Sequence, residues 1–300
     1  MRILVTGGAG FVGAALCAAL LDRSCVSHVR VLDDLSTGDP DGLDGAELRT
    51  ASVLDRDAVA AATEGMDAVV HLAARPASPE TDVTGTLNVL DACREHAARV
   101  ILASSASVYG SAPGLPKREE LPARPLTTDA AGKVAAEAYT LAYAASFGLP
   151  VLPLRLFSLY GPGQRPGRGA AVIASFVDAA LRGAPLRVYG NGRQTRDFTY
   201  VGSAAEVLAE AVLRKVTSPA PVNLGFGTRV PVLEVAHLVG DLVGRRPEIV
   251  YLPPRTGDVR DSQAAPGSLA ELFPEVKPVD LLDGLVRTIA WQRALSSCAR

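Results

Sequence analysis

Short apolar runs alternate with longer amphipathic segments through the first half of this 300-residue chain. The short runs are rich in β-branched residues and lack polar alternation, a pattern typical of parallel strands that are covered on both faces. The expected strands lie at residues 3–6, 29–33, 68–72, 100–104 and 150–154, and the expected helices at 11–22, 56–64, 82–97 and 130–147. The alternation predicts βαβ units and therefore an α/β fold with a doubly wound parallel sheet.

The regular alternation ends near residue 156, where the loop GPGQRPGRG follows. We expect further helices at residues 170–182, 204–214, 232–243 and 279–293, and short strands at 186–189, 221–224 and 248–251. This less regular pattern predicts a smaller mixed α/β C-terminal domain that would bind the substrate. We assign residues 1–157 and about 190–226 to the sheet domain, and about 158–189 and 227–300 to the smaller domain.

Composition and charge exclude several classes of protein. With 48% hydrophobic and 21% charged residues, the chain is typical of a soluble globular protein. The formal net charge of −2 lacks the basic excess of a nucleic-acid-binding surface. The sequence contains no apolar run of about 18 residues, so it predicts no membrane span. A glycine-rich turn at residues 7–13 and the lack of an A-x-A cleavage site argue against a signal peptide.

The four cysteines show neither CxxC nor CxxxH spacing. This spacing favours free thiols in a reducing cytosol over disulfides or a zinc site. We therefore expect a cytoplasmic protein without a metal site. The cysteines are Cys17, Cys25, Cys93 and Cys298.

The segment TGGAGFVG follows the first expected strand and opens the first expected helix. Its Gly7, Gly10 and Gly13 permit a tight turn and a close approach of the backbone to a pyrophosphate, which would lie at the positive end of the helix. Asp33 ends the second expected strand, twenty residues after Gly13. A carboxylate there accepts hydrogen bonds from the ribose hydroxyls of an adenosine and repels a 2′-phosphate. These residues predict a Rossmann-type dinucleotide site that prefers NAD to NADP.

Further motifs extend this pattern over nearly the whole chain. In order they are TGGAGFVG, VLDDLSTG, HLAA, GTLNVLDACR, SSASVYG, LYGPGQRP, VYGNGRQTRDFTYV and RTGDVR. In these motifs the chain resembles the NAD-dependent epimerase/dehydratase family of extended short-chain dehydrogenases. Within that family it most resembles the members that are similar to UDP-glucose 4-epimerase. The resemblance implies a permanently held NAD and the oxidation and re-reduction of a sugar hydroxyl, usually at C4. It also implies a homodimer formed through the helices near residues 85–97 and 130–147.

The resemblance implies catalytic roles for two residues and marks a third position as changed. Members of the family use a Ser/Thr, a Tyr and a Lys. Ser105 matches the serine, which hydrogen-bonds the reacting oxygen. Lys133 matches the lysine, which binds the nicotinamide ribose. Asp129 stands at the tyrosine position, so the candidate catalytic residues are Ser105, Lys133 and Asp129.

Cofactor-binding residues are implied in the glycine loop, at the end of the second strand, in the HLAA segment and at the lysine. They are Gly7, Gly10, Phe11, Val12, Gly13, Asp33, Leu72, Ala73, Ala74 and Lys133. Each of these positions matches a cofactor contact of the family, and NAD is the cofactor that we expect.

Substrate-binding residues are implied in the second half of the chain. Arg196 and Arg255 match arginines that clamp the substrate diphosphate, and guanidinium groups suit this role because they bind phosphate oxygens bidentately. Asp258 matches a carboxylate that holds the nucleotide ribose. Tyr189 lies at a position whose side chain usually lines the binding site of the nucleotide base. Ser158 replaces an asparagine that commonly touches the diphosphate. The implied partner is a nucleotide-diphosphate sugar, a UDP- or dTDP-hexose.

Asp129 differs from a tyrosine in reach and in acidity. Its carboxylate ends about 3–4 Å closer to the backbone than a phenol oxygen would. Carboxylic acids ionise near pH 4 and phenols near pH 10, so an aspartate accepts a proton weakly and rarely returns one. Two structural roles stay open for Asp129: an i, i+4 ion pair with Lys133, and the cap of the helix that begins here.

Other positions near the expected sugar site also depart from the family pattern. Gly132 stands where a serine or a similar residue precedes the lysine, and Asp82 where an asparagine usually contacts the cofactor. A carboxylate next to cofactor phosphates is repulsive unless it points away from them. The segment from residue 74 to residue 82, which normally lines the sugar pocket, is several residues shorter than usual.

The residues after Ser105 sort reaction types within the family. Ala106 and Ser107 replace the Asp-Glu pair of the dehydratases and the glutamate of the decarboxylases, so we expect neither elimination nor decarboxylation. Three functions remain open: a nucleotide-sugar 4-epimerase, a 4-ketosugar reductase, and a catalytically silent protein that binds NAD and a nucleotide sugar.

Overall fold

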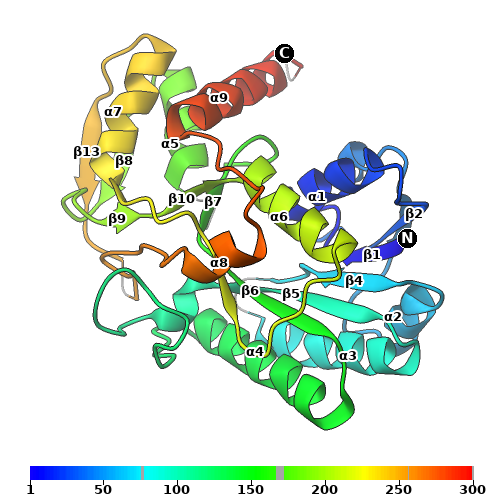
Figure 1. Ribbon diagram of the computed structural model, residues 1–300. Coiled ribbons are helices and arrows are strands. Elements are labelled where there is room, and N and C mark those ends of the chain that lie inside the picture. The colour runs from blue at the N-terminus through cyan, green and yellow to red at the C-terminus, as the bar shows by residue number, and fades with distance from the viewer. Residues whose placement is uncertain (76–77, 167–171, 256, 299–300) are drawn as a thin grey trace.

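The computed structural model describes residues 1–75, 78–166, 172–255 and 257–298. Its main sheet has seven parallel strands in the order β11-β6-β5-β4-β1-β2-β3 (Figure 1). The strands are β1 (Arg2–Thr6), β2 (His28–Asp33), β3 (Glu47–Thr50), β4 (Ala68–His71), β5 (Arg99–Ser105), β6 (Val151–Leu156) and β11 (Val222–Leu224). Strands are added in opposite directions on either side of the boundary between β1 and β4, as in a doubly wound Rossmann sheet. This topology confirms the predicted fold class.

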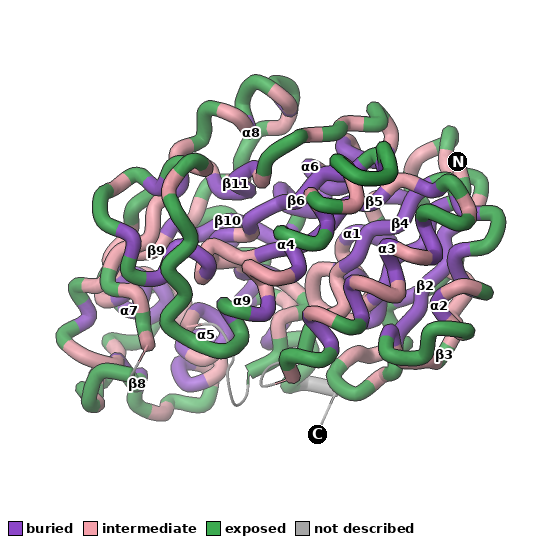
Figure 2. The backbone as a smooth tube through the Cα atoms, turned by 90° about the horizontal axis from the view of Figure 1, so that it is seen from below, coloured by how far each residue is buried: buried purple, intermediate pink, exposed green. Residues whose placement is uncertain are grey.

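Helices cover both faces of this sheet (Figure 1). Ile3 and Val5 of β1 pack in the apolar cluster that includes helices α1 and α6, whereas Leu4 packs in the cluster that includes α2 and α3. Because successive side chains of a strand point to opposite faces, a strand buried on both sides is continuously apolar. Figure 2 shows the resulting buried centre of the sheet. The helices are α1 (Phe11–Leu21), α2 (Arg56–Thr63), α3 (Thr86–Glu95), α4 (Thr128–Phe147) and α6 (Val201–Leu213).

A third apolar cluster lies in the C-terminal part, where α5, α7 and α9 pack against one another and α5 and α7 also contact β8 (Figure 1). Small sheets pair β8 with β13, β7 with β10, and β9 with β12. This mixed α/β part was expected, while the division of the chain between two domains stays a prediction. The elements are β7 (Ser158–Tyr160), α5 (Val172–Arg182), β8 (Leu186–Tyr189), β9 (Thr195–Arg196), β10 (Phe198–Tyr200), β12 (Val230–Pro231), α7 (Val232–Val243), β13 (Ile249–Leu252), α8 (Gly267–Leu272) and α9 (Leu281–Cys298).

Two differences from the expected elements have physical causes. The helix expected at residues 82–97 begins with a π-helical turn, Thr81–Gly85, before α3 continues it. π-helical turns of this kind occur frequently at functional sites. Strand β3 was not expected, because two of its four residues are charged and it forms the edge of the sheet.

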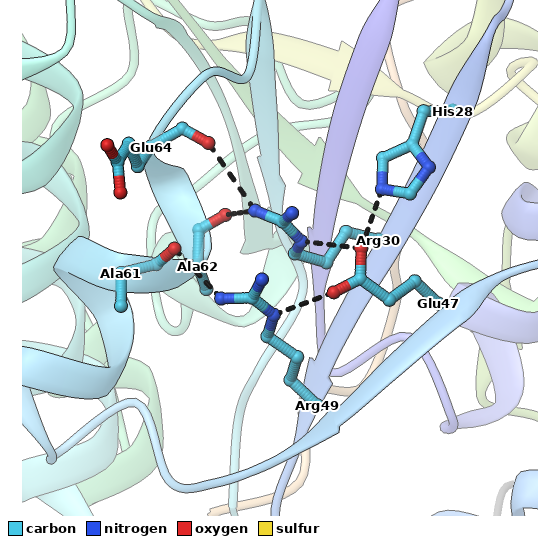
Figure 3. A network of polar contacts seen from close by, with 7 residues as sticks. All are labelled: His28, Arg30, Glu47, Arg49, Ala61, Ala62 and Glu64. Atoms are coloured by element: carbon cyan, nitrogen blue, oxygen red, sulfur yellow. Dashed lines mark hydrogen bonds and ion pairs between the residues drawn. The ribbon is translucent and has the colours of Figure 1, made fainter.

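A polar network ties this sheet edge to α2 (Figure 3). Glu47 of β3 accepts hydrogen bonds from Arg30 Nε at 3.0 Å and from Arg49 Nε at 2.8 Å, and its Oε2 lies 2.8 Å from His28 Nε2. Arg30 also donates through Nη1 to the carbonyl of Ala62 near the end of α2, at 2.8 Å. The hydrogen bonds from Arg49, Arg30 and His28 lower the pKa of Glu47 to about 2.

None of the helices in the described ranges has the length and apolar character that a membrane crossing requires. Cys17, Cys25 and Cys93 are free thiols. Burial raises the pKa of Cys17 to about 12 and also raises that of Cys93. The side chain of Cys298 lies outside the described residues.

Candidate active site

The glycine loop forms one wall of a cleft at the carboxyl ends of β1, β2 and β4. A Cβ on Gly7 would lie 2.7 Å from Ala73 N, and a Cβ on Gly13 would lie 2.3 Å from Gly7 O, so the loop keeps this shape only with glycine at both positions. The backbone is therefore open at the N-terminus of α1, where the pyrophosphate of a dinucleotide fits. Of the expected cofactor residues, those lining this cleft are Gly7, Gly10, Phe11, Val12, Gly13, Asp33, Leu72, Ala73 and Ala74.

Asp33 is buried at the end of β2 and holds the glycine loop in place. Its Oδ2 accepts a hydrogen bond from Ala9 N at 3.0 Å, and its Oδ1 accepts one from Leu35 N at 2.9 Å. Each oxygen keeps further acceptor capacity, so the carboxylate can still bind the two ribose hydroxyls of an adenosine. The loop and the carboxylate together fit NAD, and the negative charge opposes a 2′-phosphate.

Ser105 lies at the carboxyl end of β5 and faces a second cleft, defined here as the Ser105 cleft. Its Oγ accepts a hydrogen bond from Ser107 N at 3.1 Å, which starts the short 3₁₀ turn Ala106–Tyr109. Because Oγ is the acceptor in this contact, the hydroxyl proton can be donated to an oxygen of a ligand in the cleft.

The structure places Asp129 in the first turn of α4 but not at its N-cap. The cap of α4 is Thr127, whose Oγ1 accepts a hydrogen bond from Ala130 N at 3.2 Å, so the expected cap at Asp129 is wrong. Thr127 and Ala130 line the Ser105 cleft. Asp129 is exposed in the first turn of α4 and is absent from the described residues that line this cleft.

Lys133 forms an ion pair with Asp82, a partner that the sequence did not predict. Lys133 Nζ lies 2.8 Å from Asp82 Oδ1, and the Asp82 side chain is only 4% exposed. The angles at Oδ1 do not make a well-directed hydrogen bond, so the contact is chiefly electrostatic. Asp82 belongs to the π-helical turn, and its neighbour Thr81 lines the dinucleotide cleft. The carboxylate points toward the lysine, which resolves the repulsion expected beside cofactor phosphates.

A buried histidine connects this turn to the sheet. His71 Nδ1 lies 2.7 Å from Thr6 Oγ1, and His71 Nε2 lies 3.1 Å from Thr86 Oγ1. Thr86 donates its hydroxyl proton to the carbonyl of Asp82 at 2.6 Å, so it accepts from His71 Nε2–H, and Thr6 then donates to Nδ1. Burial lowers the pKa of His71 to about 3, with a smaller contribution from the positive charge of Lys133. The ring is therefore neutral at physiological pH.

A second buried network fixes α4 against β6. Glu137 accepts hydrogen bonds from Arg155 Nε at 3.0 Å and from Arg155 Nη2 at 2.8 Å, and it also accepts the hydroxyl proton of Ser104. The Arg155 guanidinium lies over the Tyr109 ring, 4.7 Å from its centroid. Tyr109 donates to Asn223 Oδ1 at 2.6 Å, which uses its hydroxyl in the core and leaves it a structural residue.

The five expected substrate residues line one cleft, defined here as the nucleotide cleft. Its lining includes Ser158, Tyr189, Arg196, Arg255 and Asp258. Three of them, Ser158, Arg196 and Asp258, also line the Ser105 cleft, so the two clefts share a wall. Residues that are far apart in the sequence thus meet where a diphosphate would join a nucleotide to a sugar.

The arginines of the nucleotide cleft already have partners within the chain. Arg196 Nη2 donates to Asp258 Oδ1 at 2.5 Å, and Nη1 donates to the carbonyls of Thr195 at 2.9 Å and Arg260 at 3.2 Å. A guanidinium has five N–H donors, so donors remain for a phosphate. Arg255 lies over the Tyr189 ring, 3.8 Å from its centroid, and its hydrogen bond lowers the pKa of Tyr189.

Two charged residues near these clefts were missed as site residues by the sequence reasoning. Asp82 was noted only as a departure from the family, because its ion pair joins segments 51 positions apart. Lys117 is buried, lines the Ser105 cleft and donates from Nζ to the carbonyl of Ala112. Burial lowers the pKa of Lys117. The residues around a lysine in an irregular loop do not indicate that it is buried. The burial of Lys117 could therefore be seen only in the structure.

Known proteins share this architecture. A family model described as NAD dependent epimerase/dehydratase family matches residues 3–225. The chain is 32% identical over 316 residues to the UDP-glucose 4-epimerase of Mycolicibacterium smegmatis, an alignment that covers 98% of this chain and 99% of that protein.

Solved structures agree over nearly their whole length. The UDP-glucose 4-epimerase of Thermus thermophilus in complex with NAD matches with a TM-score of 0.88 and 33% identity, covering 98% of this chain and 99% of that one. The UDP-glucuronic acid 4-epimerase from Bacillus cereus in complex with UDP-glucuronic acid and NAD matches with a TM-score of 0.89 and 28% identity, covering 98% and 100%. The chain therefore belongs to the NAD-dependent epimerase/dehydratase family.

Proposed function

We propose that this protein is an NAD-dependent nucleotide-sugar epimerase-like enzyme that acts at C4 of a UDP- or dTDP-hexose. The observation that carries this proposal is the wall shared by the two clefts, formed by Ser158, Arg196 and Asp258. A nucleotide in the nucleotide cleft and a sugar in the Ser105 cleft would place the diphosphate at this wall. The sugar would then lie next to the hydroxyl of Ser105.

The residues have separate roles in this proposal. NAD, when bound, supplies the group that removes a hydride from the sugar and gives it back. The glycine loop and Asp33 hold its adenosine half, and Lys133 binds the ribose of its nicotinamide half. Ser105 donates a hydrogen bond to the C4 oxygen and so fixes the reacting carbon. Arg196 and Arg255 hold the diphosphate by charge-assisted hydrogen bonds.

The proton of the C4 hydroxyl needs an acceptor other than a tyrosine. Asp129 is exposed on the first turn of α4 and is absent from the described residues that line the Ser105 cleft. We assign the proton to a water that Ser105 holds, because Lys133 is paired with Asp82 as an ammonium, which has no lone pair for a further proton. Release of the same proton completes the reaction when the hydride returns.

Two other functions are compatible with the same clefts. A 4-ketosugar reductase would use the same residues in one direction only. A silent protein that binds NAD and a nucleotide sugar is favoured by one observation, the exposed position of Asp129.

One experiment separates the three. Purified protein is incubated with a panel of UDP- and dTDP-hexoses, and with 4-ketosugars plus NADH, while absorbance at 340 nm and product identity are followed. A C4 epimer formed without net change in NADH is the expected result. Consumption of NADH with a 4-ketosugar indicates the reductase. Binding of the nucleotide sugar without any product across the panel contradicts the proposed enzyme. Ser105→Ala, which removes the hydrogen bond to the reacting oxygen, lowers turnover in both enzymatic cases.

Assembly and location are further proposals. We propose a homodimer through α3 and α4, because Tyr139 is 42% and Phe147 is 54% exposed on α4. Sedimentation of the wild type and of Phe147→Glu tests it, since a charge in the interface should give monomers. The cytoplasmic location inferred from the cysteine pattern stays a prediction.

A further inference from the structure

We propose that Asp82 is a positioning residue for Lys133, and that Gly132 is the companion residue that makes room for it. In this proposal Asp82 provides the negative partner that fixes the ammonium of Lys133, and the missing side chain of Gly132 leaves space for it. The departures at positions 82 and 132 then form one coupled change.

The first step is the location of the carboxylate. Asp82 is nearly inaccessible, and its Oδ1 lies 2.8 Å from Lys133 Nζ. Its backbone carbonyl is bound by Thr86, which in turn contacts the buried ring of His71. Through these two contacts, the π-helical turn that carries Asp82 is anchored to β4. Such an anchored carboxylate holds the lysine in one place, whereas a carboxylate on a mobile surface loop would not.

The second step is the space beside the helix. A Cβ on Gly132 would lie 2.9 Å from Asp82 Oδ2 and 3.1 Å from Asp82 Cβ. Contacts this short force one of the groups to move. Since α4 also carries the buried Glu137, which Arg155 binds, the helix backbone resists movement and the Asp82 carboxylate would be displaced. A serine at position 132 would therefore press on the Asp82 side chain and shift the carboxylate that pairs with Lys133.

The third step is the consequence for the cofactor. The residue before Asp82, Thr81, lines the dinucleotide cleft, so the π-helical turn that carries Asp82 borders the space where NAD would bind. The Lys133 side chain is 17% exposed and can donate to Asp82 and to a ribose hydroxyl at the same time. Removal of Asp82 leaves a largely buried ammonium without this counter-ion, which favours a change of side-chain position.

The test is titration of NAD into the full-length protein by calorimetry, which requires no sugar turnover. The variants are Asp82→Asn, Gly132→Ala and the double variant. We expect each single variant to weaken NAD binding by about tenfold, because each disrupts the ion pair that holds Lys133 in place. Because both changes break the same contact, the double variant should bind no more weakly than the weaker single variant.

Matched controls separate this effect from the substitutions themselves. Gly267→Ala places a methyl group in open space at the start of α8, and Asp178→Asn removes an exposed i, i+4 ion pair on α5. Both should bind NAD as the wild type does. Asp82→Asn keeps the shape of the side chain, so it remains informative if Gly132→Ala does not fold.

Rescue by the conservative variant distinguishes positioning from a merely structural role. Asp82→Glu keeps the negative charge beside Lys133, so it should bind NAD more tightly than Asp82→Asn does. Wild-type affinity in Asp82→Asn, or full additivity in the double variant, overturns the inference. The inference rests on the NAD-binding part of the proposed function only. A protein that binds NAD normally but turns over no sugar therefore leaves it intact, and the two failures can be told apart.

Discussion

Replacement of His71 by asparagine, which cannot titrate, should reduce the acid sensitivity of the fold. The folded protein keeps the pKa of His71 at about 3, because the ring is buried and Lys133 lies nearby. In the unfolded chain a histidine titrates near pH 6.5. Between these values the unfolded chain binds a proton that the folded chain does not. Stability therefore falls as the pH drops below 6.5, and this contribution stops changing near pH 3.

The magnitude follows from the same two pKa values. Each pH unit between them changes the free energy of unfolding by about 1.4 kcal/mol. From pH 7 to pH 5, His71 alone should cost the wild type about 2 kcal/mol. The variant should be less stable at both pH values, because it loses the contacts with Thr6 and Thr86. Its free energy of unfolding should lack the contribution of His71 to the pH dependence.

Urea unfolding at pH 7 and pH 5, followed by circular dichroism, measures the difference. The quantity to compare is the change in the free energy of unfolding between the two pH values, for the wild type and for His71→Asn. The substitution His237→Asn, at an exposed position on α7, controls for the exchange itself. If the wild type and His71→Asn lose the same free energy, the ring is not held neutral in the folded protein and the proposed network is wrong.

Three further predictions concern single side chains. Glu137→Gln should lower the free energy of unfolding by about 3–5 kcal/mol, because it leaves the buried Arg155 without its carboxylate, and a loss below about 1 kcal/mol in thermal unfolding would contradict the buried pair. Asp129→Tyr alone should give little gain in epimerase rate, since Asp82 still holds Lys133, while the addition of Asp82→Asn and Gly132→Ser should give a larger gain in the same assay. Equal rates in the two variants would show that the positions are independent. Glu47→Gln should lower the thermal midpoint at pH 7, and the difference from the wild type should vanish as the pH falls from 4.5 toward 2, where the carboxylate of the folded protein takes up its proton. A difference that persists at pH 2 would mean that the network of Figure 3 does not depend on that charge.

The central part of the fold could be predicted from the sequence because its signals are local. Continuous apolar runs indicated β1, β2, β4, β5 and β6, and the glycine spacing indicated the dinucleotide loop. Both patterns arise within a few residues of chain, where burial on two faces or a tight turn restricts the residue types. Strand β3 has no such pattern, because an edge strand buries little and tolerates charge.

The partners of the charged residues could not be predicted in the same way. The i, i+4 spacing pointed from Lys133 to Asp129, yet the observed contact with Asp82 comes from another segment. Ion pairs of this kind depend on how α4 packs against the π-helical turn, and a missing Cβ at position 132 decides that packing. The expected substrate residues were chosen through resemblance. The structure places all five along one cleft, but the resemblance did not show that Arg196 and Asp258 bind each other.

The contact between Arg196 and Asp258 should make the nucleotide cleft selective among anions. An inorganic phosphate or sulfate that approaches Arg196 has to compete with a carboxylate that is always present, because it belongs to the same chain. Asp258 is 39% exposed and sits on the loop that also carries Arg255, so it can turn toward another hydrogen-bond donor. A nucleotide diphosphate offers such a donor in its ribose hydroxyls, together with the phosphate oxygens that Arg196 would receive in exchange. The internal carboxylate should therefore favour a ligand that carries both groups over an inorganic anion.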